Sequence, residues 1–180
     1  MATEEFNPND PVGSFTSTWQ RVMLDPRSFF TELPAAGGLQ APFLFALICL
    51  GIGGVSFLIF GGGIKGLLCF TVLGVFRLFL GSAIVALIAQ HLFEGKGDYE
   101  STFRALAYSS AAVVVIGVPL VKYFAALYTA YVTIVGLANA HSFDNGRALL
   151  TVLTTAIVGI VLTTAFGLWD VAHRCNPLLQ

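Results

Sequence analysis

Long apolar segments separated by short polar breaks dominate the chain after residue 40. Such blocks, about 17–25 residues or longer with almost no charge, have the length that crosses the hydrocarbon core of a bilayer as a helix. The pattern predicts an all-α fold, a polytopic integral membrane helix bundle with five transmembrane helices, at about 42–60, 66–93, 103–119, 124–140 and 148–169. These spans form one transmembrane domain over residues 41–169, which a polar tail at 170–180 follows.

The number of spans depends on the region around Pro119. A helix from Arg104 to Ala140 is too long for one crossing at about 1.5 Å per residue. We therefore expect Gly117 and Pro119 to separate two spans, because proline breaks helices. One kinked helix over residues 113–140 is the alternative.

The first 33 residues follow another pattern, in which single apolar residues recur at helical spacing among polar ones. Asp10-Pro11 and Asp25-Pro26 each pair a capping side chain with a proline that fits the first helical position. We expect residues 1–33 to form an N-terminal cytosolic segment with an amphipathic interfacial helix on the membrane surface. Packing of the stripe on the protein's own helices or on a partner is the alternative. The expected interfacial anchors are aromatic: Phe15, Trp19, Phe29 and Phe30.

Charge excludes one class of partner and weakly sets the orientation. Nine Lys plus Arg and ten Asp plus Glu give a net charge of −1, so no field favours nucleic acid. With the N-terminus in the cytosol, five basic residues lie inside and three outside, in the direction of the positive-inside rule. The sequence thus predicts a bacterial inner (cytoplasmic) membrane protein with a cytosolic N-terminus. The inner residues are Arg21, Arg27, Lys96, Arg104 and Arg147, and the outer ones are Lys65, Lys122 and Arg174.

Arg77 lies near the centre of the second predicted span, where a charge costs at least about 2.5–3.5 kcal/mol. No predicted span contains Asp or Glu, so its partner must be a neutral group, a lipid phosphate, or a carboxylate of the N-terminal segment or another subunit. Gly74 and Gly81 share its helix face and would let another backbone approach. Asn139 and Tyr108 complete the candidate lipid or ligand residues. Snorkelling of Arg77 to an interface is the alternative.

Patterns of known catalytic chemistry are not found. The sequence has no nucleophile–base set, carboxylate pair or phosphate-binding glycine loop, so we expect neither an enzyme nor a cofactor. His91 and His141 end two spans on the same side, but neither has the paired spacing of a helical metal site. We expect no metal, with these histidines as weak candidates.

A set of short motifs runs through the chain from about Thr18 to Leu168. The most specific is Thr102 to Ser110, and the others are Trp19, Leu24-Asp25-Pro26, Phe29-Phe30, Gly97-Asp98-Tyr99, Gly117-Val118-Pro119, Gly136 to His141 and Arg147-Ala148. Together they resemble bacterial members of the Yip1 superfamily. The resemblance implies a five-span protein with a cytosolic N-terminus. Eukaryotic relatives are linked to vesicle traffic and Rab-type small GTPases; this chain does not contain their Asp-Leu-Tyr-Gly-Pro motif, so GTPase binding is not carried over.

Two functions fit these observations. The first is a non-enzymatic Yip1-type membrane protein that organises lipid or protein partners, including a homo-oligomer formed through its Gly/Ala faces. The second is a small transporter or channel in which Arg77 lines a path for an anionic or polar solute.

Overall fold

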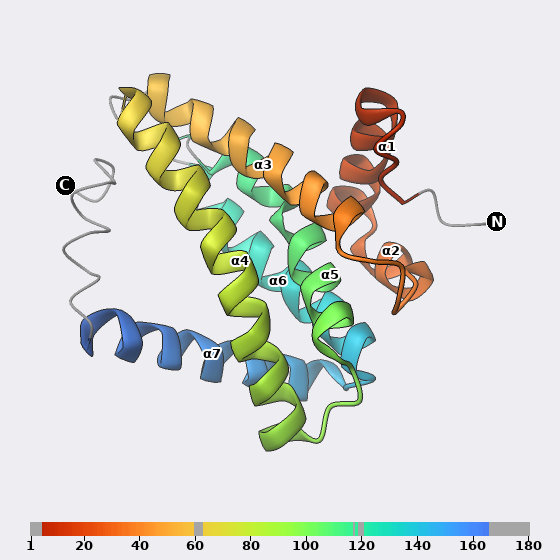
Figure 1. Cartoon of the computed structure of the whole chain (residues 1–180). Helices are drawn as coiled ribbons and strands as arrows, with labels where there is room; N and C mark the ends of the chain where they lie inside the picture. Colours follow the sequence, from red (N-terminus) through yellow and green to blue (C-terminus); the bar gives the residue numbers. More distant parts are fainter. Residues whose placement is uncertain (1–4, 60–62, 117, 119–120, 166–180) are drawn as a thin grey trace.

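The computed structural model describes residues 5–59, 63–116, 118 and 121–165, which form helices joined by turns and loops. Figure 1 shows α3 and α4 diverging from one end of the molecule, α5 between them with α6 behind, and α1 and α2 at one edge. In the same view α7 runs away from the other helices. The elements are α1 (Pro11–Leu24), α2 (Pro26–Glu32), α3 (Gln40–Ile59), α4 (Gly63–Phe93), α5 (Tyr99–Ser109), the 3₁₀ helix η1 (Ser110–Val115), α6 (Val121–His141) and α7 (Asn145–Ala165).

Aspartates start three of these helices. Asp10 accepts a hydrogen bond from the Gly13 amide at 3.2 Å, and Pro11 is the first residue of α1. Asp25 accepts one from Ser28 at 3.2 Å to start α2, and Asp98 accepts one from Ser101 at 2.8 Å to start α5. Each carboxylate pairs an amide that the first helical turn leaves without a partner. The helix starts that the sequence predicts at Pro11 and Pro26 are therefore present, and α5 begins in the same way at Tyr99.

Three helices of the described chain are long and apolar enough to cross a membrane: α4, α6 and the Asn145–Thr164 part of α7. This length and composition are those of an integral membrane protein. The apolar part of α3 extends over Gln40–Ser56, and α5 with η1 continues the path that the sequence predicted as the third span. The expected break at Gly117 and Pro119, the end of the last span and the polar tail lie outside the described residues.

The core lies between the N-terminal helices and α5. The side chains from Ser101 to Ala105 are all buried, and Tyr108 is fully buried one turn further on. The Tyr108 ring has its centroid 5.1 Å from those of both Phe29 and Phe45. Small side chains on α5 let these rings approach closely, so the segment before residue 33 is part of the core.

This packing changes the picture of the predicted interfacial anchors. Phe29 and Phe30 are buried inside the protein, and Phe15 and Trp19 are half-buried against the same core. The Trp19 indole donates a hydrogen bond to the Ala111 carbonyl at 2.9 Å. The stripe packs on the chain's own helices because α5 and η1 offer an apolar surface and a carbonyl acceptor. Phe29 and Phe30 are therefore not surface anchors in this structure. They follow the alternative, in which the stripe packs on the protein's own helices.

Candidate functional site

Arg77 lies at the middle of α4, the longest helix, and its side chain is exposed. Its neighbours along the helix are apolar and exposed too, with Phe76 at 63% and Leu80 at 49%. Within the part of the chain that the structure describes, no hydrogen bond or ion pair reaches its guanidinium. Since about 21 Å of helix separate Arg77 from the start of α4 and about 24 Å from its end, its charge has no nearby helix end to compensate it.

The two glycines beside Arg77 have different surroundings. A Cβ atom added at Gly74 would lie 2.7 Å from the Leu50 side chain, so α3 packs closely there. A Cβ atom added at Gly81 would meet nothing within 4 Å. The described chain therefore brings a neighbour to one side of Arg77 and leaves the other side open.

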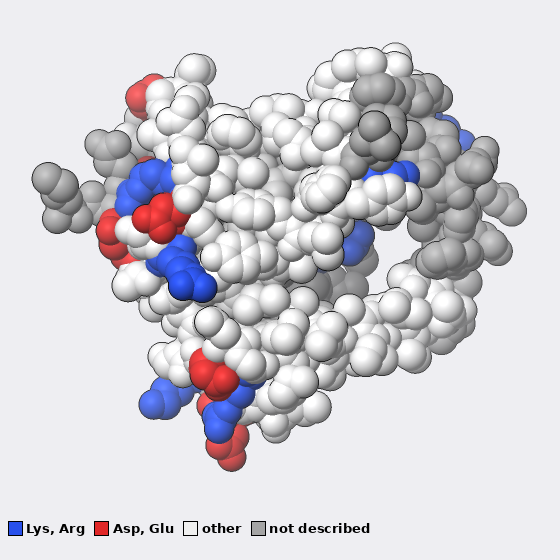
Figure 2. Space-filling view, turned by 180° about the vertical axis from the view of Figure 1, so that it is seen from behind, with Lys and Arg blue, Asp and Glu red and all other residues white. Residues whose placement is uncertain are grey.

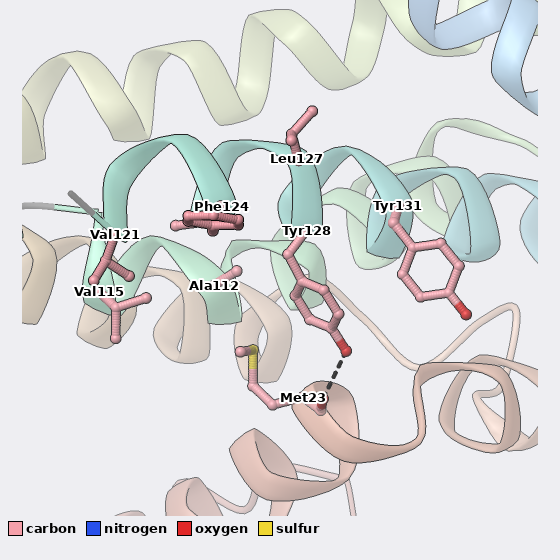
Figure 3. Close-up of a pocket in the computed structure, with 9 residues that line it drawn as sticks. Met23, Ala112, Val115, Val121, Phe124, Leu127, Tyr128 and Tyr131 are labelled. Carbon is pink, nitrogen blue, oxygen red and sulfur yellow. Dashed lines mark hydrogen bonds between the residues drawn. The ribbon is translucent and has the colours of Figure 1, made fainter.

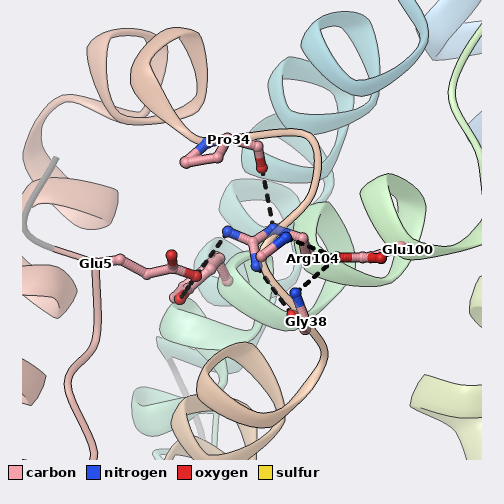
Figure 4. Close-up of polar contacts among 7 residues, drawn as sticks. Glu5, Pro34, Gly38, Glu100 and Arg104 are labelled. Atoms are coloured by element: carbon pink, nitrogen blue, oxygen red, sulfur yellow. Dashed lines mark hydrogen bonds and ion pairs between the residues drawn. The ribbon is translucent and has the colours of Figure 1, made fainter. Parts of the chain in front are cut away.

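Tyr108 belongs to a buried polar cluster, separate from Arg77, that the sequence did not predict. Its hydroxyl donates to Glu5 Oε1 at 2.8 Å, and Arg104 Nη2 donates to the same oxygen at 2.7 Å. Arg104 also donates from Nε to the Pro34 carbonyl at 3.0 Å and from Nη1 to the Gly38 carbonyl at 2.9 Å (Figure 4). The Arg104 side chain is 0% exposed. A buried charge is tolerated only when it is paired and hydrogen-bonded, and these contacts meet that requirement.

Glu100, one turn before Arg104 on α5, holds the loop that covers Arg104. Glu100 Oε1 accepts hydrogen bonds from the Gly37 and Gly38 amides at 2.8 and 2.7 Å. These two amides hold the pKa of Glu100 below its usual value. Gly38 has a φ of +84°, which favours glycine at this point of the loop. The loop, α5 and the chain before α1 are thus joined around one guanidinium.

Asn139, another candidate, is exposed on α6 and accepts a hydrogen bond from the Thr31 hydroxyl at 3.3 Å. Its amide nitrogen donates to the Val135 carbonyl at 2.9 Å. This contact joins α2 to α6. Asn139, Tyr108 and Arg77 therefore occupy different environments, and the structure does not gather the candidates into one site.

The histidines also differ. His91 is exposed, whereas His141 is buried and lies with Nε2 2.9 Å from the Thr102 hydroxyl. That hydroxyl also lies 2.7 Å from the Asp98 carbonyl, and when it donates its only proton there, His141 Nε2 is the donor in the His141–Thr102 pair. Its Nδ1 has no hydrogen-bond partner among the described residues. In that same part of the chain no three His, Cys, Asp or Glu side chains form a group that could hold a metal ion.

An open apolar groove of about 470 Å³ runs along α6. Figure 3 shows Phe124 and Tyr128 of α6 facing Ala112 and Val115 of η1, with Met23 closing the far side. The Tyr128 hydroxyl donates to the Met23 carbonyl at 2.6 Å. That hydrogen bond occupies the Tyr128 hydroxyl. The other side chains that line the groove are mainly apolar and would contact a hydrocarbon chain.

Sequence reasoning missed Glu5 and placed Arg104 only as an inner-face charge. The signal for the pair was weak, because Glu5 and Arg104 are 99 positions apart and Glu5 lies in a segment without helical pattern. A lone basic residue near the start of a predicted span was the only available hint. The sequence did propose a carboxylate of the N-terminal segment as an arginine partner, but for Arg77.

Comparison with protein families identifies the family of the chain. The model of the Yip1 domain matches residues 21–166, so the chain belongs to the Yip1 family, a family of non-enzymatic membrane proteins. The match confirms the resemblance noted from the motifs. It begins inside α1, after Glu5 and the first part of that helix. No curated protein and no solved structure matches the chain significantly.

Proposed function

We propose that this Yip1-family protein crosses the inner membrane of a bacterium five times, with its N-terminus in the cytosol, and organises lipid or protein partners within the bilayer. The five crossings are α3, α4, the part of α5 and η1 from Phe103 onward, α6 and α7, so Glu100 lies before the third crossing. The observation that carries the proposal is Arg77, a charge at the middle of an apolar helix whose guanidinium lacks a partner in the described chain. A partner from outside that chain would compensate it.

The chemistry of Arg77 favours an anionic partner. A guanidinium binds phosphate or carboxylate through several donors at once. At the centre of a hydrocarbon layer its charge is costly, and a snorkelling side chain or a local lipid defect lowers that cost. A lipid phosphate drawn toward Arg77, or a polar group of a second membrane helix, would meet both requirements.

The exposed surface of α7 supports a role in partner binding. Ala148 and Thr151 are buried near its start, whereas Ile157 and Ile160 are 62% and 61% exposed further along. Only 11% of the apolar 18-residue stretch of α7 is buried inside the protein. Lipid or another membrane helix would cover this surface, because water does not wet an apolar helix in a bilayer.

The test is native mass spectrometry of the full chain purified in mild detergent with native lipid, comparing wild type with Arg77→Gln. We expect wild type to retain anionic lipid that Arg77→Gln loses. Lys65→Gln is the matched control, since it removes a positive charge from an exposed position near the start of the same helix. Equal lipid retention by all three proteins, with equal oligomer numbers, would remove Arg77 from the proposal.

A transporter is the second candidate, favoured by the separation of α7 from the other helices. Figure 2 shows an opening between the free half of α7 and the body of the protein, with Lys or Arg side chains at its edge. A water-filled path there predicts that a cysteine at Leu73, one turn from Arg77, reacts with a membrane-impermeant thiol reagent. A lipid-facing or partner-covered Arg77 predicts no reaction. Cysteine at exposed Lys65, which the predicted orientation places on the outer side, is the positive control.

A further inference from the structure

Glu5 and Phe6 are adjacent residues that fill two adjacent sites of opposite character. The Glu5 carboxylate binds Arg104 and Tyr108 through one oxygen (Figure 4). The Phe6 side chain is 3% exposed and packs edge-on against Phe45, with ring centroids 6.2 Å apart. Phe45 in turn contacts the Tyr108 ring at 5.1 Å. The Glu5 carboxylate and the Phe6 ring thus lie side by side inside the helix bundle.

The receiving side is held in place by contacts that do not involve Glu5. Arg104 keeps its hydrogen bonds to the Pro34 and Gly38 carbonyls, and a Cβ atom added at Gly37 would lie 3.0 Å from its Nη1. If Glu5 left, Arg104 Nη2 and the Tyr108 hydroxyl would still point at the same place. A buried guanidinium without an anion is strongly destabilised, so the vacated place would favour another acidic group.

The occupying side is attached less firmly. The Glu5 side chain is 23% exposed, and only one of its carboxylate oxygens has hydrogen bonds in the described chain. Glu5 and Phe6 lie in non-helical chain before α1. The nearest tie is at Asn7, whose amide donates to the Ser14 hydroxyl at 3.0 Å. Withdrawal of the two residues breaks the bonds of Glu5 to Arg104 and Tyr108 and exposes the Phe6 ring, so a displacing ligand has to replace these contacts.

We propose that Arg104, Tyr108 and the apolar surface at Phe45 form a binding site for an anionic lipid, which Glu5 and Phe6 occupy in this structure as a displaceable plug. The lipid's acidic head would replace the Glu5 carboxylate, and the start of its acyl chain would replace the Phe6 ring. The site is separate from Arg77 and does not depend on the function proposed for that residue.

The first experiment measures lipid binding by native mass spectrometry in the full chain carrying Arg77→Gln, so that lipid retained at Arg77 does not contribute. The probe is dioleoyl phosphatidic acid, with dioleoyl phosphatidylcholine as the neutral lipid. Removing the plug with Glu5→Gln plus Phe6→Ala should raise phosphatidic acid affinity at least about tenfold, because the competing occupant is gone. Glu32→Gln, which removes a carboxylate from an exposed ion pair with Arg21, should leave the affinity unchanged.

A third variant tests whether the gain in phosphatidic acid affinity comes from the site at Arg104 and Tyr108. Adding Tyr108→Phe to the plug variant removes one donor to the head group and should abolish most of the gain. No gain in the plug variant, an equal gain for phosphatidylcholine, or a gain that survives Tyr108→Phe would each overturn the proposal.

The second experiment uses the Arg77→Gln chain with its plug intact, so it does not depend on the folding of the plug variant. Hydrogen exchange at residues 5–10 should quicken several-fold with phosphatidic acid and stay constant with phosphatidylcholine. Unchanged exchange at saturating phosphatidic acid would contradict a displaceable plug. If inorganic phosphate alone quickened exchange as much, the site would be an oxyanion site, and the acyl-chain half of the proposal would be wrong.

Discussion

Two arginines in the helices of this protein have opposite surroundings. Arg104 on α5 is fully buried and donates to two carbonyls and one carboxylate. Arg77 on α4 is exposed among exposed apolar side chains and has no such contact in the described chain. The comparison shows that the sequence positions of charged residues do not reveal which arginine pairs with groups inside the protein.

The difference separates a structural charge from one available for partners. Arg104 joins three parts of the chain that are remote in sequence: the residues before α1, the loop before α3, and α5. Arg77 joins none of the described parts. A fold that had to satisfy Arg77 internally would need a polar group inside the bilayer, and the apolar helices beside it supply none.

The largest expected effect comes from Arg104→Gln. It leaves the Pro34 and Gly38 carbonyls without their charged donor and removes the partner of Glu5, which should destabilise the protein by about 3–5 kcal/mol. The same change at Arg77 should alter stability by less than about 0.5 kcal/mol, as expected for a side chain without partners. Unfolding of both variants in one detergent, followed by circular dichroism, measures the difference. Equal losses would break the comparison between the two arginines.

Trp19→Glu should have the next largest effect, about 2–3 kcal/mol, on the side of the core where Arg104 lies. It removes the indole bond to the Ala111 carbonyl and brings a carboxylate against the core. Docking of residues 11–33 should weaken, and a protease should cut there sooner. Val12→Glu is the control on the same helix, since Val12 is 78% exposed. Unchanged protease resistance in Trp19→Glu would mean that this stripe does not hold α1 in place.

Local chemistry made part of this structure predictable. The two Asp-Pro pairs predicted two helix starts, because capping depends on neighbouring residues alone. Apolar length indicated the membrane helices for a similar reason. The Glu5–Arg104 pair was not predictable, since it depends on how α1, α5 and the loop before α3 pack. The burial of Phe29 and Phe30 was missed for the same reason: an amphipathic stripe looks alike whether lipid or a neighbouring helix covers it.

Thr102→Val sharpens the comparison in the first turn of α5. The substitution removes the partner of His141 Nε2 and leaves both ring nitrogens without hydrogen bonds, at a cost of about 1–2 kcal/mol. Thr155→Val on α7 is the matched change in the open region, where the hydroxyl donates only to the Thr151 carbonyl within its own helix. We expect that loss to stay within about 0.5 kcal/mol. Thermal unfolding of the two variants compares them, and equal shifts would mean that α5 is no more tightly held than α7.

The smallest expected effect is a pH dependence of the loop around Arg104. The Gly37 and Gly38 amides lower the pKa of Glu100 from its ordinary value of 4.5, so the unfolded chain binds a proton more readily than the folded one. The stabilisation by Glu100 is therefore complete above about pH 4.5 and is lost as the pH falls through the lowered pKa. Thermal unfolding at pH 6 and pH 4 should show a smaller acid-induced loss in Glu100→Gln than in wild type. Glu94→Gln, an exposed carboxylate without a described contact, should behave as wild type; if it matches Glu100→Gln instead, the acid sensitivity comes from overall charge and the loop around Arg104 is not its source.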